Sequence, residues 1–587
     1  MARASRLKTL LCAVGAAGSD VSDAAAAAEG SGSSASSSGG GRHHAKGHRV
    51  RTILIIVAVA VVLVLYVWFH PSLNPQSFYL WVVIAVASLV ALIVLLISSG
   101  HLREDQGRRL RRWCAIPGAL LAVFVIGLVL SLPVFPGNAA RYASVLEVED
   151  GNFEQDIEEV DYSEVPVIDR DSAELLGDSA LGTISDYVSQ FEVADTYSQI
   201  NYQGSPVRVS PLVYADIYKW WANRSEGIPG YVVVDMVTQE AEVVRLDEGI
   251  KYSESEHFLR NIDRYTQLRY PFYSFDQKSF ELDEDGTPWW VFPVQKRTIG
   301  LFGGTTISRV VLVNACTGET YDYAVDECPE WVDRAYPADL LIEQYEWAGA
   351  YSNGWLNSWI GQQGVVTTTE GSDSSMSYNY LAQDGDIYLY TGVTSATADS
   401  SIVGFILVNQ RTAEARYYAV AGATEDSAMS SAEGAVQDLG YEATYPLLLN
   451  VAGQPTYFMA LKDDAGLVKM YAMICVEEYQ EVATGDTVAE TQEAYLAMLA
   501  ADGTLTDEEA AEAAATEEVT GVIDGIAQAV IDGNSHFYIT LEGSDAIYDV
   551  ALPDLVGIVA FEVGDEITLT YVAEPDEDGV YEVVALG

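Results

Sequence analysis

Three long apolar runs constrain what this chain can fold into more than any other feature. They read TILIIVAVAVVLVLYVWF (52–69), FYLWVVIAVASLVALIVLLI (78–97) and WCAIPGALLAVFVIGLVLSLPVF (113–135), and none of them contains a charged residue. Because an α-helix rises about 1.5 Å per residue, a run of about 20 residues crosses about 30 Å of hydrocarbon. Three successive runs are hard to bury in a soluble helical hairpin. We therefore predict a three-helix membrane anchor over residues 51–136.

The segments that flank the runs carry unequal charge. The connection HPSLNPQS (70–77) has no Lys or Arg, whereas GHLREDQGRRLRR (100–112) holds five Arg and residues 42–51 add four more basic side chains. Basic loops next to membrane spans stay in the cytoplasm. We therefore expect a plasma-membrane protein with a cytoplasmic N-terminus and with residues 137–587 outside. Residues 1–50 are rich in Ala, Ser and Gly, which predicts a disordered cytoplasmic tail.

Charge divides the chain into a basic head and an acidic body. The net charge is -54, and residues 141–587 hold 80 Asp and Glu against 19 Lys and Arg. Proteins that bind a phosphate backbone need clustered Lys and Arg, so nucleic acid is excluded as a partner. The simplest explanation of the acidic composition is that the charge keeps the protein soluble. Weak binding of divalent cations or cationic peptides is the alternative.

A short pattern, Asp or Asn followed by x-x-Thr-x-Glu, occurs three times in the acidic body. It ends the apolar stretches in GYVVVDMVTQEAEVVRL (from Gly230), RVVLVNACTGETYDYAV (309–325) and GFILVNQRTAEARYYAV (404–420). Asp and Asn accept hydrogen bonds from the backbone two residues on, and Thr does so more weakly. The flanks are rich in strand-forming residues. The pattern therefore predicts a β-hairpin turn at Asp235, Thr238 and Glu240, at Asn314, Thr317, Gly318 and Glu319, and at Asn409, Thr412 and Glu414.

The context of the turn repeats as well, with an aromatic strand before it and a helical stretch after it. We predict an α+β fold class of tandem antiparallel-sheet-plus-helix units over residues 206–501, after a connecting segment at 137–205. The expected units cover about 206–275, 276–350, 351–450 and 451–501. The fourth keeps the order of elements but loses the turn pattern.

The second unit resembles PepSY-type domains, which are small extracytoplasmic α+β modules with a strand that ends in an Asp-x-x-Thr-Gly-Glu turn. Asn314, Thr317, Gly318 and Glu319 match that pattern, whereas the other two units have Gln239 and Ala413 in place of Gly. The resemblance covers about 40 residues per unit. It implies a binding or regulatory module in the cell envelope, and it supplies no catalytic residue.

The C-terminal region predicts a separate small barrel. Residues 502–518 form a charged, Ala-rich linker, and five β runs follow over 519–587, separated by Gly-Asn, Gly-Ser and Asp-Gly turns. This pattern is similar to that of an OB-type five-stranded barrel. No Lys or Arg follows Lys469, so we expect a spacer or protein contact rather than a nucleic-acid site.

Sequence motifs for catalysis or for a cofactor are missing. There is no CxxC, HExxH, GxSxG or P-loop, and the ectodomain has only His257 and His536, which we place in different domains. Cys316 and Cys328 are expected at opposite ends of one strand, too far apart for a disulfide. The stretch LDEDGTPWW (282–290) lacks the full spacing of a calcium loop and is interpreted as a hairpin turn. We predict no cofactor and no metal.

Aromatic residues offer the remaining candidates for ligand contact. WAGAYSNGWLNSWIGQQG (347–364) places Tyr351, Trp355 and Trp359 among Gly, Ser and Asn. Such a segment can stack on sugar rings or clasp a peptide, although anchoring of a long connection is the simpler explanation.

We therefore expect a non-catalytic, membrane-anchored binding or regulatory protein, whose partner is another envelope protein or a cell-wall component. The alternative is a membrane-anchored hydrolase that acts on glycan or peptide through paired carboxylates. A cleft with two inward-facing carboxylates of raised pKa favours the enzyme, and an open sheet edge or an apolar groove favours the binder.

Overall fold

A computed structural model gives the fold for most of the chain. It describes residues 56–57, 59–100, 104–157, 165–184, 187–369, 378–383, 385–506, 516–531, 534–541, 543–544, 546–552, 555–561, 563–572 and 580–586. The chain divides into two compact units, Met1–Trp68 and Phe69–Gly587. The predicted tail at residues 1–50 lies outside the described residues.

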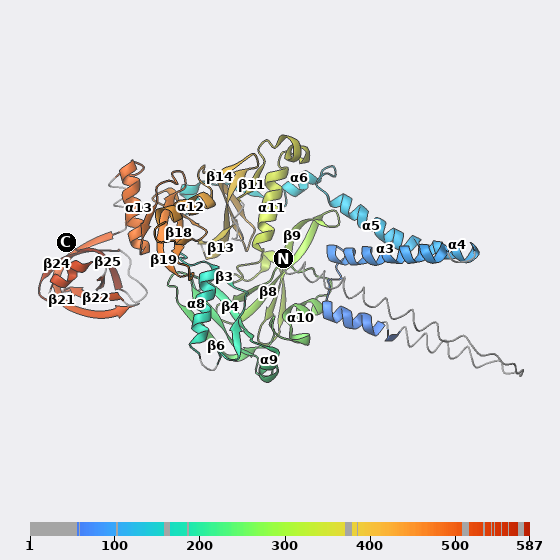
Figure 1. The fold of residues 1–587 in the computed structure, drawn as a ribbon, viewed down its shortest axis with the longest axis horizontal. Helices are drawn as coiled ribbons and strands as arrows, with labels where there is room; N and C mark the ends of the chain where they lie inside the picture. Colours follow the sequence, from blue (N-terminus) through green and yellow to red (C-terminus); the bar gives the residue numbers. More distant parts are fainter. Residues whose placement is uncertain are drawn as a thin grey trace, which may run out of the picture. The chain divides into compact units, whose positions relative to one another are not determined.

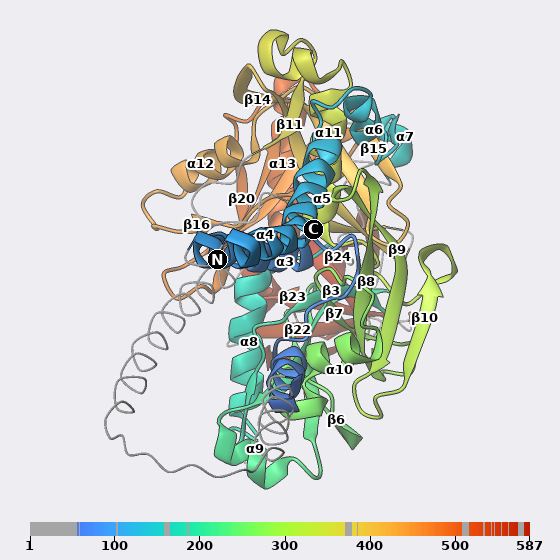
Figure 2. The same cartoon turned by 90° about the vertical axis from the view of Figure 1, so that its right-hand side faces the viewer.

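The second unit begins with an apolar helical hairpin made of α3 (Phe78–Gly100), α4 (Glu104–Trp113) and α5 (Ala115–Ser131). Helices α3 and α5 pack against each other (Figures 1 and 2). Two stretches are long and apolar enough to cross a membrane, Phe78–Ser99 and Leu110–Ser131. The prediction of three spans therefore holds for two.

The first predicted span, 52–69, forms only the short apolar helix Val59–Phe69 among the described residues. The basic connection predicted at 100–112 is also not simply a loop. It is helical from Glu104 onward, because Leu, Arg and Gln favour helix and extend α5 backwards.

The described part of the body that follows contains four sheets in succession, antiparallel except for one strand pair. Each is built around a four-stranded meander that runs in chain order, and Figure 1 follows them through the colours of the sequence. The strands of the first two are β3 (Ser198–Tyr202), β4 (Ser205–Tyr214), β5 (Ile228–Asp235) and β6 (Ala241–Ile250), then β7 (Ser279–Leu282), β8 (Pro288–Ile299), β9 (Gly303–Asn314) and β10 (Thr320–Ala324). The strands of the last two are β12 (Asn379–Gln383), β13 (Asp386–Ser395), β14 (Ala398–Asn409) and β15 (Ala415–Tyr418), then β17 (Leu447–Val451), β18 (Gln454–Lys462), β19 (Val468–Cys475) and β20 (Ala483–Gly485).

A helix precedes each meander along the chain. These helices are α8 (Arg170–Gly182), α10 (Ile262–Arg269), α11 (Ala338–Tyr351) and α12 (Glu425–Ala435), and α13 (Val488–Asp502) follows the last sheet. Short elements complete the body, namely α6 (Asn138–Ala143), α7 (Phe153–Asp156), α9 (Ile217–Asn223), η2 (Phe258–Arg260), η3 (Val325–Glu327) and η4 (Asn357–Gly361). Mixed α+β architecture is thus confirmed.

Alternate residues of β9 enter two different hydrophobic cores. Val311 and Val313 belong to the larger core, whereas Val310 and Leu312 belong to a second core that also receives residues of α11, β13 and β14. All four side chains are at most 2 % exposed. A strand covered on both faces needs a continuous apolar run, which explains why RVVLVN does not alternate with polar residues.

The segment 137–205, predicted as a connection, supplies strands to two sheets. β1 (Val148–Asp150) pairs in parallel with β15, and β2 (Phe191–Val193) and β3 pair with β4. Two further short strands, β11 (Val366–Thr368) and β16 (Glu442–Ala443), pair with β13 and β18. Because β1 and β15 are far apart in the sequence, no local pattern could have predicted their pairing.

A small barrel ends the chain. Its strands are β21 (Thr516–Ile531), β22 (Asn534–Leu541), β23 (Ile547–Ala551), β24 (Glu566–Val572) and β25 (Val580–Leu586), in the closed order β21-β22-β23-β25-β24. The short helix η5 (Val556–Ala560) lies between β23 and β24 in the chain. Residues 516–518, predicted as linker, belong to β21.

Candidate functional site

The repeated turn is held by its Asp or Asn side chain. The Asn314 Oδ1 accepts the N–H groups of Cys316 at 3.0 Å and Thr317 at 2.8 Å. Asp235 and Asn409 accept the equivalent pairs of N–H groups at 2.8–3.0 Å. This is the Asx geometry in which the side chain replaces a backbone acceptor.

The Thr and Glu positions complete the same turn. The hydroxyls of Thr238, Thr317 and Thr412 accept the backbone N–H of the Glu two residues on, at 3.4, 3.2 and 3.2 Å. The backbone carbonyls of Glu240, Glu319 and Glu414 then accept the N–H of Asp235, Asn314 and Asn409 at 2.8–2.9 Å. The turn thus uses the backbone of each Glu, and its residues do not form a reactive cluster.

Neither cysteine near this turn is activated. Cys316 and Cys328 are both free thiols. Burial raises the pKa of Cys316 to about 11 and that of Cys328 to about 12. Because the thiolate is the nucleophile, such thiols are inert at neutral pH.

Histidines do not supply a base to a nucleophile in the described residues. The His257 ring packs against the Trp220 ring at 4.6 Å, beside η2. The His536 Nδ1 lies 2.9 Å from Asp549 Oδ2 on neighbouring barrel strands. Each imidazole therefore has a local structural partner.

Two carboxylates of raised pKa do come together, at the junction of the first three sheets. The Glu281 Oε2 accepts the backbone N–H of Asp333 at 2.9 Å, and Glu281 Oε1 accepts the hydroxyl of Ser279. The Asp333 Oδ2 accepts the N–H of Asn201 at 2.6 Å. Burial raises the pKa of both carboxyls, and the charge of Glu281 raises that of Asp333 further.

These carboxylates are closed to solvent. Glu281 is 0 % and Asp333 is 2 % exposed. Nearby, Asp386 pairs with Arg411 and accepts the Asn409 side-chain amide at 2.7 Å. Hydrogen bonds join Asp333 to β3 and β7, and the charges of Asp386 in β13 and Arg411 in the turn after β14 act on the same carboxyl. The chemistry of this group is that of a buried polar contact between sheets.

A third buried carboxylate, Glu425, lies at the first residue of α12. It is 1 % exposed and accepts the N–H of Gly392 at 2.6 Å. Burial raises its pKa, and the buried Tyr390 and the half-buried Tyr445 lie beside it. A Cβ on Gly392 would lie 2.6 Å from its Oε1, so the close approach requires glycine at this position.

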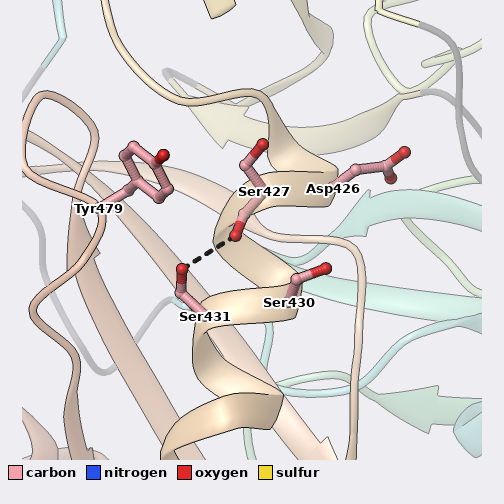
Figure 3. A pocket seen from close by; sticks show the side chains of 5 residues that line it. All are labelled: Asp426, Ser427, Ser430, Ser431 and Tyr479. Atoms are coloured by element: carbon pink, nitrogen blue, oxygen red, sulfur yellow. Dashed lines mark hydrogen bonds between the residues drawn. The ribbon is translucent and has the colours of Figure 1, made fainter. Parts of the chain in front are cut away.

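A pocket of about 410 Å³ lies on the outer side of α12 (Figure 3). Asp426, Ser427, Ser430, Ser431 and Tyr479 line it. The Ser431 hydroxyl donates to the backbone carbonyl of Ser427 at 3.0 Å, as the dashed line in Figure 3 marks. This lining holds one carboxylate and no histidine or lysine, so it contains no Ser–His or Ser–Lys pair.

The predicted ligand-contact aromatics separate into two groups. The centre of the Tyr351 ring lies 6.0 Å from that of Tyr142 in α6, so this side chain packs against another part of the protein. Trp355 and Trp359 stack at 6.1 Å with their planes 19° apart. Trp359 is 73 % exposed, and its neighbours Leu356 and Ile360 are 60 % and 68 % exposed.

Sequence reasoning missed a junction between the apolar hairpin and the body. The hydroxyl of Ser131, at the end of α5, accepts the N–H groups of Leu301 at 3.0 Å and Phe302 at 2.9 Å. Leu301 and Phe302 form the tip of the β8–β9 hairpin. The Phe302 ring then packs against Phe78 of α3 at 5.5 Å and Phe124 of α5 at 5.8 Å.

Further contacts reinforce this junction. The Tyr142 hydroxyl donates to the carbonyl of Ser131 at 2.7 Å, and Asn138 donates to those of Leu130 and Leu132 at 2.8 and 2.9 Å. A Cβ on Gly127 would lie 2.8 Å from Leu301, so the tip approaches the helix closely. The only sequence signal is the three glycines around Leu301 and Phe302, at positions 300, 303 and 304, which mark a hairpin tip but not its partner.

The segment before α3 is attached to the body as well. The N–H of Leu73 donates to the carbonyl of Pro271 at 2.7 Å, and the hydroxyls of Ser72 and Ser274 lie 3.1 Å apart. The Gln76 side chain donates to the carbonyl of Arg297 at 3.3 Å. The body therefore holds the hairpin at both of its chain ends.

Comparison with known proteins finds no protein-family model that matches this chain and no curated protein that matches it. The similarity to PepSY-type domains remains a prediction from the turn residues alone.

Proposed function

We propose that this chain is a membrane-anchored extracytoplasmic protein of the cell envelope that binds or regulates another component without catalysing a reaction. The apolar helices anchor it to the lipid bilayer, and the partner is an envelope protein or a cell-wall component. The PepSY-like units form the binding body. We interpret the C-terminal barrel as OB-like and as a protein contact or spacer.

The observation that carries this proposal is the junction of the hairpin with the body. A simple tether would need only a flexible linker between membrane and ectodomain. Here the tip of the β8–β9 hairpin packs between α3 and α5, and its backbone is bonded to Ser131. Such a joint suits a protein that holds a binding surface at a set orientation to the membrane.

The buried carboxylates support a non-catalytic role. A general acid and its partner must reach substrate directly or through one water. Glu281 and Asp333 instead direct their oxygens to backbone N–H and hydroxyl groups of the protein and are at most 2 % exposed. Their raised pKa follows from burial, which structural networks also produce.

Two measurements on the full chain test the proposal. In cells from which every layer outside the plasma membrane has been removed, added protease is expected to digest residues 137–587 and to spare the N-terminal tail. This outcome requires that residues 52–69 also cross the membrane, as the sequence predicts. Purified chain in nanodiscs is expected to release no product from a panel of peptide and glycan substrates.

The controls are Glu281→Gln and Asp333→Asn, which keep the shape of each side chain. Turnover that survives purification and disappears in either variant would overturn the non-catalytic role. A body that protease cannot reach from outside would refute the orientation, whatever the substrate screen gives.

A further inference from the structure

Strand β10 forms an uncovered edge of the second sheet. The sheet order is β10-β9-β8-β7, and within the described residues no strand pairs with the outer side of β10. Figure 2 shows β10 beyond β9 at the margin of the sheet. Its five residues are half-buried or exposed, with Tyr321 45 % exposed.

The direction of the edge groups follows from the ladder. The Asn314 N–H donates to the Glu319 carbonyl, so Asn314 and Glu319 form a hydrogen-bonded pair at the turn end of the ladder, although the Glu319 N–H donates to the Thr317 hydroxyl instead. In an antiparallel ladder such pairs recur at every second residue. Tyr321 and Tyr323 therefore bond to β9, whereas the N–H and C=O groups of Thr320 and Asp322 point away from it.

The third sheet shows what fits such an edge. By the turn pattern, Ala415 and Tyr417 of β15 are equivalent to Thr320 and Asp322 of β10. In that sheet β1 lies along the edge in parallel, with Val148 opposite Ala415 and Asp150 opposite Tyr417. The N–H of Gly151 donates to the carbonyl of Tyr417 at 2.8 Å.

The corresponding edge of the first sheet is less open. Helix α8 packs against β6, and Val243, which is equivalent to Asp322, is only 8 % exposed. Among the three units that share the turn pattern, the edge of β10 is therefore the one that pairs with no further described strand and keeps an accessible surface.

We propose that the edge of β10 binds an extended segment of a partner polypeptide, which adds to the sheet in parallel as β1 does in the third sheet. This inference rests on the proposed binding function and names its ligand class. Main-chain hydrogen bonds to Thr320 and Asp322 supply the register, and side chains on alternate positions supply the selectivity.

One face of this edge is an aromatic shelf. The Tyr321 ring lies 5.8 Å from Trp289 and 6.4 Å from Tyr323. In the third sheet the residue opposite the equivalent Arg416 is Glu149. Since Tyr321 replaces that Arg, the incoming residue opposite it is aromatic or β-branched rather than acidic.

The other face carries one charge pair, Arg309–Asp322, at 2.6 Å. An Arg309 Nη also donates to the Asp322 carbonyl at 3.1 Å, and that oxygen keeps a second lone pair for an incoming N–H. Acidic residues flank the strand at Glu319, Asp326 and Glu327. A segment with basic residues at its ends therefore complements the site.

Hydrogen–deuterium exchange at single-residue resolution tests the edge in the full chain in nanodiscs. Without any ligand, the amide of Tyr417 is expected to exchange slowly and that of Asp322 quickly. The probe is the tightest peptide selected from a random decapeptide phage library. On its addition, the amides of Thr320 and Asp322 are expected to slow, whereas those of Tyr321 and Tyr323 are slow from the start.

A matched pair of variants separates the backbone from the side chain. Thr320→Pro removes the outward N–H at the first residue of an edge strand, where proline is tolerated. It is expected to raise the Kd of the peptide about tenfold, in line with the loss of one hydrogen bond. Thr320→Val keeps the outward N–H and loses the hydroxyl, which accepts a hydrogen bond from the Tyr270 hydroxyl at 3.1 Å within the protein, and it is expected to leave the Kd unchanged.

Three results would overturn the inference: a library that yields no binder, a binder that leaves the exchange of Thr320 and Asp322 unaltered, or equal Kd changes in the two variants. Slowing of these amides with rising protein concentration and no peptide would assign the edge to a second copy instead. None of these results affects the protease and turnover measurements. If the edge site fails its test, the proposal of a membrane-anchored binding protein is still tested separately by those measurements.

Discussion

Ser131→Ala is expected to loosen the junction between the apolar hairpin and the body. The Ser131 hydroxyl accepts two backbone N–H groups, from Leu301 and Phe302, at 3.0 and 2.9 Å. Phe302 is 8 % exposed, so its N–H has little access to water, whereas Leu301 is half-buried and can gain a water molecule. One buried unsatisfied N–H costs about 1–3 kcal/mol, and the partial loss at Leu301 brings the total to about 2–4 kcal/mol.

The assay is hydrogen exchange of the Phe302 amide in the full chain in nanodiscs. A loss of about 2–4 kcal/mol corresponds to exchange that is about 30- to 1,000-fold faster. Ser88→Ala is the matched control, because Ser88 is a buried serine of α3 and the expected change is below about 0.5 kcal/mol. Equal exchange of the Phe302 amide in the two variants would refute the assigned role of Ser131.

Three further perturbations have expected outcomes. Because burial raises the pKa of Glu425 above its ordinary value of 4.5, the folded chain holds that proton more tightly than the unfolded chain, and stability is lost as pH rises from 4.5 through the folded pKa. Glu425→Gln should therefore gain stability over the wild type at pH 7 but not at pH 4 in chemical denaturation, and an equal change at both pH values would contradict this. Gly318→Ala should lower the free energy of unfolding by about 2–4 kcal/mol, because the new side chain sits on a left-handed backbone and overlaps Tyr252. Ala413→Gly at the equivalent position should change it by less than about 1 kcal/mol, and similar effects of the two substitutions would disprove the turn argument. Trp359→Phe should remove part of the tryptophan fluorescence quenching by brominated lipids in nanodiscs. Trp359 is 73 % exposed and follows α11, whose Tyr351 packs against Tyr142 of α6, the helix next to the apolar hairpin, so we expect Trp359 to face the lipid. Unchanged quenching would place the Trp359 side chain in water.

Structure could be predicted from the sequence where the residues that bond to one another lie close together along the chain. The Asx turn at Asn314 is complete within six residues, so residue identities and spacing were enough to expect it. The five barrel strands were bounded by turn residues, and the predicted region 519–587 differs from the observed one, Thr516–Leu586, by at most three residues at either end. Apolar length and composition predicted three spans, and two of them are helices long enough to cross a membrane.

Contacts between distant segments were not readable. Ser131 accepts a hydrogen bond from Phe302, which is 171 residues away in the sequence, and neither residue type indicates which residue it will contact. The chain has 85 Asp and Glu, so nothing distinguished Glu281 and Asp333 before their burial was known. The parallel strand β1 is three residues long and acidic at two of them, which local strand propensity does not favour.

A distance distribution between the hairpin and the body tests the central claim most directly. Spin labels at Val90 of α3 and Tyr321 of β10 occupy side chains that are 55 % and 45 % exposed, and double electron–electron resonance in nanodiscs reports how widely their separation varies. A body fixed through Ser131 and Phe302 predicts one narrow distribution that broadens in Ser131→Ala. A broad distribution in the wild type, unaltered by that substitution, would show that the hairpin is only a tether and would contradict the account.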